Sequence, residues 1–227
     1  MGNKEDRDNR IIQQFEYENP QFQVLKKLGQ GQHGIAYELE DGNAVKFTID
    51  KREIRVCNSI LGLTNNNICN VYEMGELYDA SDERLYKWII QERLFDNANF
   101  TVHQSVNDFR HTWFGLYSPD KFSGLNEGSL WEIYNKDNKQ AIQHAKGLLT
   151  RYIQNINLEE EQRYPRLTRR AIDERLSNSL MFFDFIQEAY QELFKICPFG
   201  RIDLNDGNFL FDKNGHLKTF DILAIDE

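Results

Sequence analysis

The chain has 227 residues, of which 40% are hydrophobic and 13% aromatic, enough for one sizeable core or two small lobes that share a cleft, so disorder throughout is excluded. The formal net charge of -9 excludes a general electrostatic attraction to nucleic acid or to an anionic membrane. No apolar run approaches the roughly 20 residues that cross a bilayer, so we expect a cytoplasmic protein with neither nucleic acid nor membrane as partner.

The first part of the chain is predicted to form a lobe rich in β-strands. Residues 1–21 are polar and charged, and we expect a loose arm or one marginal helix, with the fold starting near Phe22. Residues 22–94 then form the lobe, in which one amphipathic helix is predicted over residues 51–61. Period-two alternation predicts five strands, around residues 22–28, 35–39, 43–48, 68–77 and 85–94.

Residues 95–227 change to helical periodicity and are predicted to form a reduced, mainly helical second lobe. The predicted helices cover residues 130–156 and 166–196, and a terminal hairpin has strands at residues 208–211 and 216–220. The predicted fold class is therefore α+β and bilobal. The stretch 97–124 has no clear period, and its aromatic residues admit two interpretations, core packing or docking of a partner; they include Trp113, Phe114 and Tyr117.

A glycine-rich segment, GQGQHG, separates the first two predicted strands and contains Gly29, Gly31 and Gly34. A dinucleotide-binding glycine loop would run from a strand directly into a helix, whereas this one has strands on both sides. A loop flanked by strands can fold over phosphates as a flap. A simple turn between two strands would explain the same glycines.

Lys46 lies within the apolar strand AVKF, and Glu53 follows on the predicted helix. A glutamate on that helix could hold the ammonium group toward phosphates while limiting the free-energy cost of burying it. The alternative for each residue is an ordinary solvent-exposed side chain.

The segment RIDLNDGN and the following hairpin concentrate carboxylates and amides. Asp203 and Asn208 bracket a tight loop, and Asp221 ends the second hairpin strand. Carboxylate and amide oxygens of this kind suit Mg²⁺, and Asp203 would remain to orient a hydroxyl nucleophile. Taken singly, each residue could instead cap a turn.

In this order and spacing, the motifs from Phe22 to Asp221 resemble those of the protein-kinase-like superfamily. The resemblance implies ATP and magnesium (or manganese) as cofactors, Asp203 as the catalytic base supported by Lys46 and Glu53, and Asn208 with Asp221 as metal ligands. The segment IIQERL resembles the hinge that contacts adenine. The residues implied to bind the nucleotide are Gly29, Gly31, Gly34, Ala36, Ala44, Lys46, Gln91, Glu92 and Leu94.

Four positions depart from the family pattern. Arg201 and Ile202 precede Asp203 where His-Arg is usual, Asn205 replaces a lysine, and Leu223 replaces the glycine of the DFG triplet. The chain also leaves no room after Asp221 for an activation segment, so we expect a minimal serine/threonine kinase similar to those of lytic bacteriophages and bacterial effectors. Its partner would be a protein substrate of a host cell; the sequence leaves the oligomeric state open.

Three alternatives remain at this stage. The first is a pseudokinase that binds a nucleotide or a partner without catalysis, which Asn205 and Leu223 favour. The second is a small-molecule kinase of the antibiotic or choline type. The third keeps the fold but transfers AMP instead of phosphate.

Overall fold

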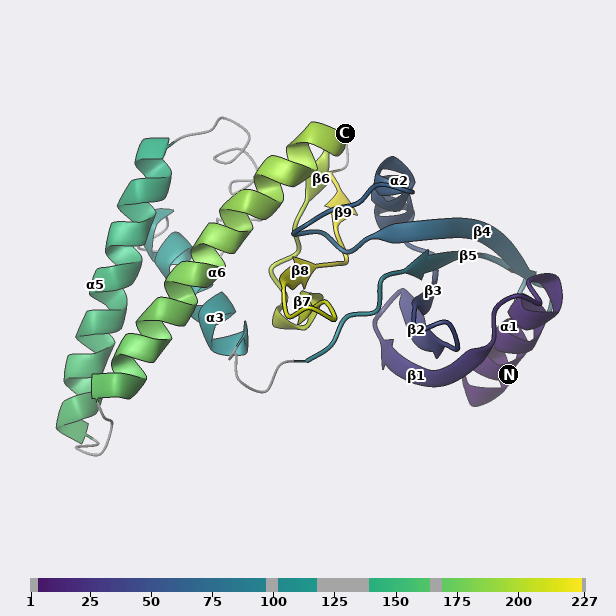
Figure 1. Ribbon diagram of the computed structural model, residues 1–227, viewed down its shortest axis with the longest axis horizontal. Helices are drawn as coiled ribbons and strands as arrows, with labels where there is room; N and C mark the ends of the chain where they lie inside the picture. The colour runs from purple at the N-terminus through teal and green to yellow at the C-terminus, as the bar shows by residue number, and fades with distance from the viewer. Residues whose placement is uncertain (1–3, 97–101, 118–138, 164–168, 226–227) are drawn as a thin grey trace. The chain divides into compact units, whose positions relative to one another are not determined.

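The computed structural model describes residues 4–96, 102–117, 139–163 and 169–225 and divides into two compact units (Figure 1). The first unit consists of Met1–Asn65 and Cys69–Leu94, and the second of Asn66–Ile68 and Phe95–Ile225. A five-stranded antiparallel sheet comes first and a mainly helical region follows, which confirms the predicted α+β class.

The first unit is built on one antiparallel sheet with the strand order β1-β2-β3-β5-β4. Its strands are β1 (Val24–Gln30), β2 (Gly34–Leu39), β3 (Ala44–Thr48), β4 (Val71–Asp79) and β5 (Arg84–Gln91). All five strands were predicted, because apolar residues alternate with polar ones where one face of a sheet is buried.

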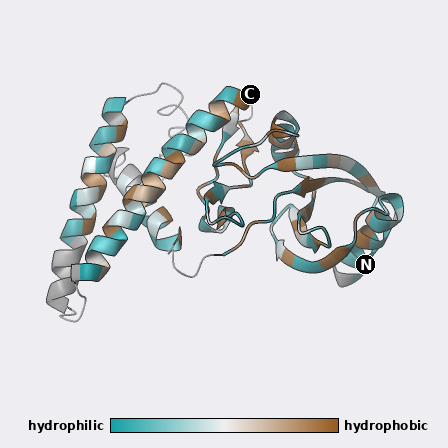
Figure 2. Cartoon of the chain, in the orientation of Figure 1, coloured by the Kyte–Doolittle hydropathy of each residue, from teal (hydrophilic) through white to brown (hydrophobic). Residues whose placement is uncertain are grey.

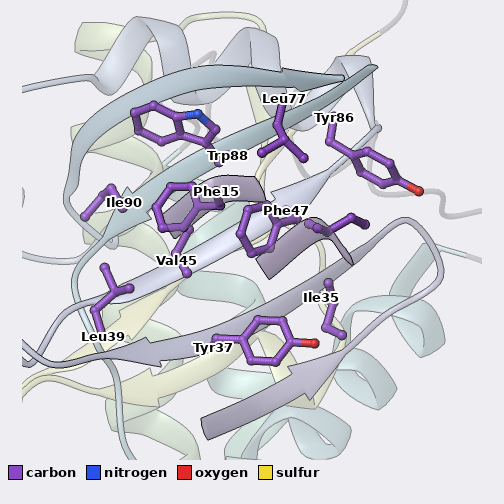
Figure 3. Close-up of a cluster of buried hydrophobic side chains, with 11 residues drawn as sticks. Phe15, Ile35, Tyr37, Leu39, Val45, Phe47, Leu77, Tyr86, Trp88 and Ile90 are labelled. Atoms are coloured by element: carbon purple, nitrogen blue, oxygen red, sulfur yellow. The ribbon is translucent and has the colours of Figure 1, made fainter. Parts of the chain in front are cut away.

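One face of this sheet carries the core of the first unit, and helix α1 (Lys4–Glu18) contributes to it. Figure 3 shows Phe15 of α1 among the aromatic side chains of the sheet, with ring centroids 5.3 Å from Phe47 and 5.6 Å from Trp88. Ile11 and Phe15 are 2% and 0% exposed. The other buried members of this cluster are Ile35, Tyr37, Leu39, Val45, Leu77, Tyr86 and Ile90.

The expectation of a loose arm before Phe22 is therefore wrong, and the alternative of a helix is confirmed. A polar helix of 15 residues is marginal alone, and here it is stabilised by burying a stripe spaced four residues apart, Ile11 and Phe15, against the sheet. Arg10 adds an ion pair of 3.1 Å to Asp79 at the end of β4. The fold thus begins with α1.

The predicted strand over residues 68–77 begins later, at Val71, because the preceding segment belongs to the second unit. The carboxylate of Glu192 accepts hydrogen bonds from the backbone N–H groups of Asn66 and Asn67, each at 2.8 Å. Ile68 forms an isolated parallel bridge with Thr219. These contacts hold the segment away from the register of β4.

The second unit packs helices α3 (Val102–Tyr117), α5 (Lys139–Arg163) and α6 (Arg169–Ile196) against one another (Figure 1). Figure 2 shows hydrophobic and hydrophilic residues following one another along α6, and its apolar stripe includes the fully buried Phe182 and Phe183. Within the described ranges, no helix is long and apolar enough to cross a membrane.

Two helix predictions need correction. The stretch 97–124, for which no element was predicted, contains α3, while the side chains of Trp113, Phe114 and Tyr117 lie outside the described residues. Helix α5 runs to Arg163, beyond the predicted end at Ile156. The first part of that prediction, residues 130–138, lies outside the described residues. Polar residues can extend a helix past its apolar period, which explains the longer α5.

A buried polar network joins α3 to α6. The carboxylate of Asp108 receives two hydrogen bonds from Arg175, at 3.0 and 2.8 Å, and one from Ser179 at 2.8 Å. Because Asp108 is 0% exposed, its charge is stabilised by these donors in place of water.

The C-terminal part of the second unit consists of two small antiparallel pairs. Strand β6 (Gly200–Arg201) pairs with β9 (Leu223–Ala224), and β7 (Phe209–Phe211) pairs with β8 (Leu217–Thr219). A single 3-10 turn, η1 (Asp206–Asn208), precedes β7. The predicted hairpin is confirmed, whereas the two-residue pair β6-β9 was not predicted.

Candidate functional site

The register of the sheet places several predicted nucleotide-binding residues on one face. Ala36 lies opposite Lys46 across β2 and β3, and Ala44 lies opposite Gln91 across β3 and β5. Gly34, two residues before Ala36, shares their face because side chains alternate along a strand. This face is opposite to the core face, so the small residues and Lys46 do not compete with the core for space.

Lys46 and Glu53 form a buried ion pair. The Nζ atom of Lys46 lies 2.6 Å from Oε1 of Glu53, and the two side chains are only 12% and 6% exposed. Two residues separate β3 from helix α2 (Lys51–Ile60), and this short connection brings the first turn of α2, with Glu53, beside the strand. Glu53 is therefore not the solvent-exposed helix residue of the alternative interpretation, and the pair provides a fixed cation on this face.

The glycine-rich loop closes as a tight turn, in which Gly31 N–H donates to Gly34 O at 2.9 Å. A Cβ atom at Gly34 would lie 2.8 Å from the carbonyl oxygen of Phe47, so only glycine fits there without a shift. A Cβ atom at Gly29 or Gly31 would meet nothing within 4 Å. Gly34 is thus needed by the sheet itself, whereas a side chain at Gly29 or Gly31 would meet no neighbouring atom.

The predicted hinge starts at Gln91, the last residue of β5. The N–H of Glu92 donates to Asn70 O at 2.9 Å, and its carboxylate accepts from Asn70 Nδ2 at 2.9 Å. Because that N–H is already bonded, Glu92 could meet an adenine only through its carbonyl oxygen, which accepts a weak hydrogen bond from Cys69 Sγ at 3.4 Å. Leu94, the other implied contact, is the last residue of the first unit.

In the second unit, the structure brings Asp203 and Asn208 together. Asn208 Nδ2 donates to Asp203 Oδ2 at 2.9 Å, and Asn205 N–H donates to Asp203 Oδ1 at 3.2 Å. Both oxygens of Asp203 are therefore oriented, and each keeps capacity to accept a further proton or hydrogen bond. Since the amide nitrogen of Asn208 is engaged, its oxygen is the atom left for a cation.

Asp221 has a backbone φ of 54°, in the left-handed region that a non-glycine residue rarely adopts. Strain of this kind concentrates at functional sites, where surrounding contacts enforce it. Phe220 N–H donates to Asn208 O at 3.1 Å, so Asp221 is one residue away from a direct contact with Asn208. On the C-terminal side of Asp221, Leu223 pairs with Arg201, which lies two residues before Asp203.

Asn208 and Asp221 fit a magnesium ion by the chemistry of their oxygen donors. Mg²⁺ is usually held by one or two protein carboxylates, with water and substrate phosphates completing its shell. In the described part of the chain, no three His, Cys, Asp or Glu side chains gather as a metal site of their own. Any magnesium bound here would therefore depend on ligands from a nucleotide or water.

Two contacts were not predicted. The ring of His103 on α3 pairs with Asp206 in η1, and its hydrogen bond lowers the pKa of that carboxyl group. No local pattern reveals this pair, because the residues are far apart in sequence. The second contact joins Thr48 to Glu53; the Asp-x-x-Glu pattern of residues 50–53 signals the start of the helix but does not reveal this partner of Glu53.

The predicted residues thus form two groups, Lys46 with Glu53 in one compact unit and Asp203 with Asn208 in the other. No protein-family model and no curated protein matches this chain. The kinase resemblance therefore depends on the motifs, and a function has to be argued from the chemistry of these two groups.

Proposed function

We propose that this chain is an ATP- and magnesium-dependent phosphotransferase, a minimal serine/threonine protein kinase that acts on a hydroxyl group of a host-cell protein. The observation that carries the proposal is the buried pair of Lys46 and Glu53 on the same sheet face as Gly34, Ala36 and Ala44. A buried ammonium ion that a carboxylate holds in place supplies a positive charge of the kind that phosphate oxygens bind. Small side chains, those of Ala36 and Ala44, accompany Lys46 on this face of β2 and β3.

Each residue then has a defined role. Lys46, oriented by Glu53, binds the α- and β-phosphates of ATP. Asp203, oriented by Asn208 and by the N–H of Asn205, accepts the proton of the substrate hydroxyl as its oxygen attacks the γ-phosphorus and ADP leaves. Asn208 and Asp221 would hold a magnesium ion, whose charge would offset that of the phosphates.

The position of Leu223 supports a kinase that needs no activation step. Leu223 stands where the family has a glycine, and in β9 it pairs with Arg201 of β6. This pairing restrains the backbone two residues after Asp221. The departure at Leu223 is therefore compatible with catalysis in a constitutively competent enzyme.

The direct test is transfer of label from γ-labelled ATP with magnesium to casein and to the protein itself. General-base catalysis contributes about 10²- to 10⁴-fold, so Asp203→Asn should lower the rate by at least about a hundredfold. Lys46→Met and Asp221→Asn should abolish transfer. Lys87→Met is the matched control, because Lys87 pairs with the exposed Glu76 on the same sheet.

The outcomes separate the alternatives. Magnesium-dependent ATP binding without any transfer would favour a nucleotide-binding pseudokinase. Incorporation of α-label instead of γ-label would favour AMP transfer. Full activity of folded Lys46→Met, Asp203→Asn and Asp221→Asn would refute the assignment of these residues.

A second measurement concerns the metal. Calorimetric titration of ATP with and without magnesium should show a magnesium-dependent gain in affinity for the wild type. Asp221→Asn should lose most of that gain, since the ion connects protein and phosphates. Equal gains in both proteins would remove Asp221 from the metal site.

A further inference from the structure

Thr48 connects the end of β3 to the start of α2 through its hydroxyl group. The hydroxyl donates to Oε2 of Glu53 at 2.9 Å and accepts from the N–H of Asp50 at 3.2 Å. Thr48 is 0% exposed, so water does not reach these bonds. The hydroxyl therefore has one bond in each direction inside a buried site.

This arrangement is a modified helix cap. Asp50 is the N-cap of α2, and its side chain accepts from Arg52 N–H at 2.9 Å. In the usual capping box, the glutamate three residues after the cap would itself accept the N–H of the cap residue. Here the Thr48 hydroxyl oxygen accepts the hydrogen bond from that N–H, and the Thr48 hydroxyl donates a hydrogen bond to Oε2 of Glu53. The other carboxylate oxygen of Glu53, Oε1, accepts from Lys46.

We infer that Thr48 is a positioning residue: its buried hydroxyl orients Glu53, and Glu53 orients the phosphate-binding Lys46. The role in nucleotide binding rests on the proposed function. Only Ile49 and Asp50 separate β3 from α2. This short connection keeps the backbone of Glu53 close to β3, and the hydroxyl of Thr48 holds its side chain toward Lys46.

The hydrogen-bond link is tested by a double-mutant cycle in urea unfolding. Thr48→Val preserves the shape of the side chain but leaves two buried groups without the hydroxyl, so the unfolding equilibrium should shift by about tenfold or more. In a Glu53→Gln background the same change should have a clearly different effect, because the two side chains are in contact. Additive effects would overturn the link.

The positioning role is tested by the affinity for ADP with magnesium, measured by calorimetry. Thr48→Val should weaken binding about tenfold, and Thr48→Ser, which keeps the hydroxyl, should stay within about threefold of the wild type. Thr112→Val is the matched control, since Thr112 is also buried and hydrogen-bonded but lies on α3. It should destabilise the protein and leave ADP affinity unchanged.

Normal ADP affinity in Thr48→Val would overturn the positioning role. An equal loss in Thr112→Val would assign the effect to general destabilisation and would overturn it as well. A wild-type chain that binds no nucleotide overturns the proposed function and the positioning role with it. The urea cycle then still decides whether Thr48 orients Glu53.

Discussion

Replacing Lys46 by methionine should destabilise the first unit as well as stop the proposed phosphoryl transfer. The change removes the cation from a carboxylate whose side chain is only 6% exposed. Removing one partner of a buried ion pair destabilises a protein by about 3–5 kcal/mol. Because the Thr48 hydroxyl still donates to Glu53, we expect the lower end, about 3 kcal/mol.

Urea unfolding followed by tryptophan fluorescence measures this effect. With a slope of about 2 kcal/mol per molar urea, the midpoint should fall by about 1.5 M. The control Lys87→Met, whose partner Glu76 is 58% exposed, should lose less than about 1 kcal/mol. Adding Glu53→Gln to Lys46→Met should restore stability, because it removes the buried negative charge that Lys46 balanced, but should not restore the proposed phosphoryl transfer. Equal midpoints for Lys46→Met and the control would refute the buried pair.

Three further predictions concern the first unit. Gly34→Ala should lower the thermal midpoint, because its Cβ would meet a backbone carbonyl at 2.8 Å, while Gly31→Ala, with nothing within 4 Å, should not; equal midpoints would contradict the difference. Phe15→Ala should cost about 3–5 kcal/mol and lower the melting temperature by about 10 °C, and an unchanged melting temperature would mean that α1 is not docked. Burial alone would raise the pKa of Asp79, but its hydrogen bond with Arg10 lowers that pKa below the ordinary value. The pair therefore stabilises the fold above the unfolded pKa of about 3.9, and this stabilisation is lost as the pH falls through the lower pKa of the folded state. Unfolding in urea at pH 7 and pH 3 should therefore show a larger deficit for Arg10→Ala at pH 7, and equal deficits would contradict it.

The strands and the long helices were predictable because their patterns repeat within a few residues. Elements without such a repeat were not. The α1 stripe of Ile11 and Phe15 is too sparse to predict docking, and it is buried only because the sheet offers an apolar face. The two-residue strands β6 and β9 are too short for any period and exist through their mutual pairing.

The candidate site shows the same division. Spacing alone singled out Lys46, Asp203, Asn208 and Asp221, because residue types and their order are local properties. Nothing in the spacing determined that Glu53 would be buried. That depends on how soon α2 follows β3 and on the sheet beneath it, which are properties of the packed first unit.

The amino-acid sequence by itself determined the α+β class, the five strands and the candidate residues for phosphate and magnesium, since periodicity and side-chain chemistry are local properties. Only the tertiary structure decided which of those side chains are held in place. It buried the ion pair of Lys46 with Glu53, bonded Asn208 to Asp203 and forced Asp221 into a left-handed backbone. The physical reason is that burial and hydrogen-bond partnership depend on neighbours brought together by folding.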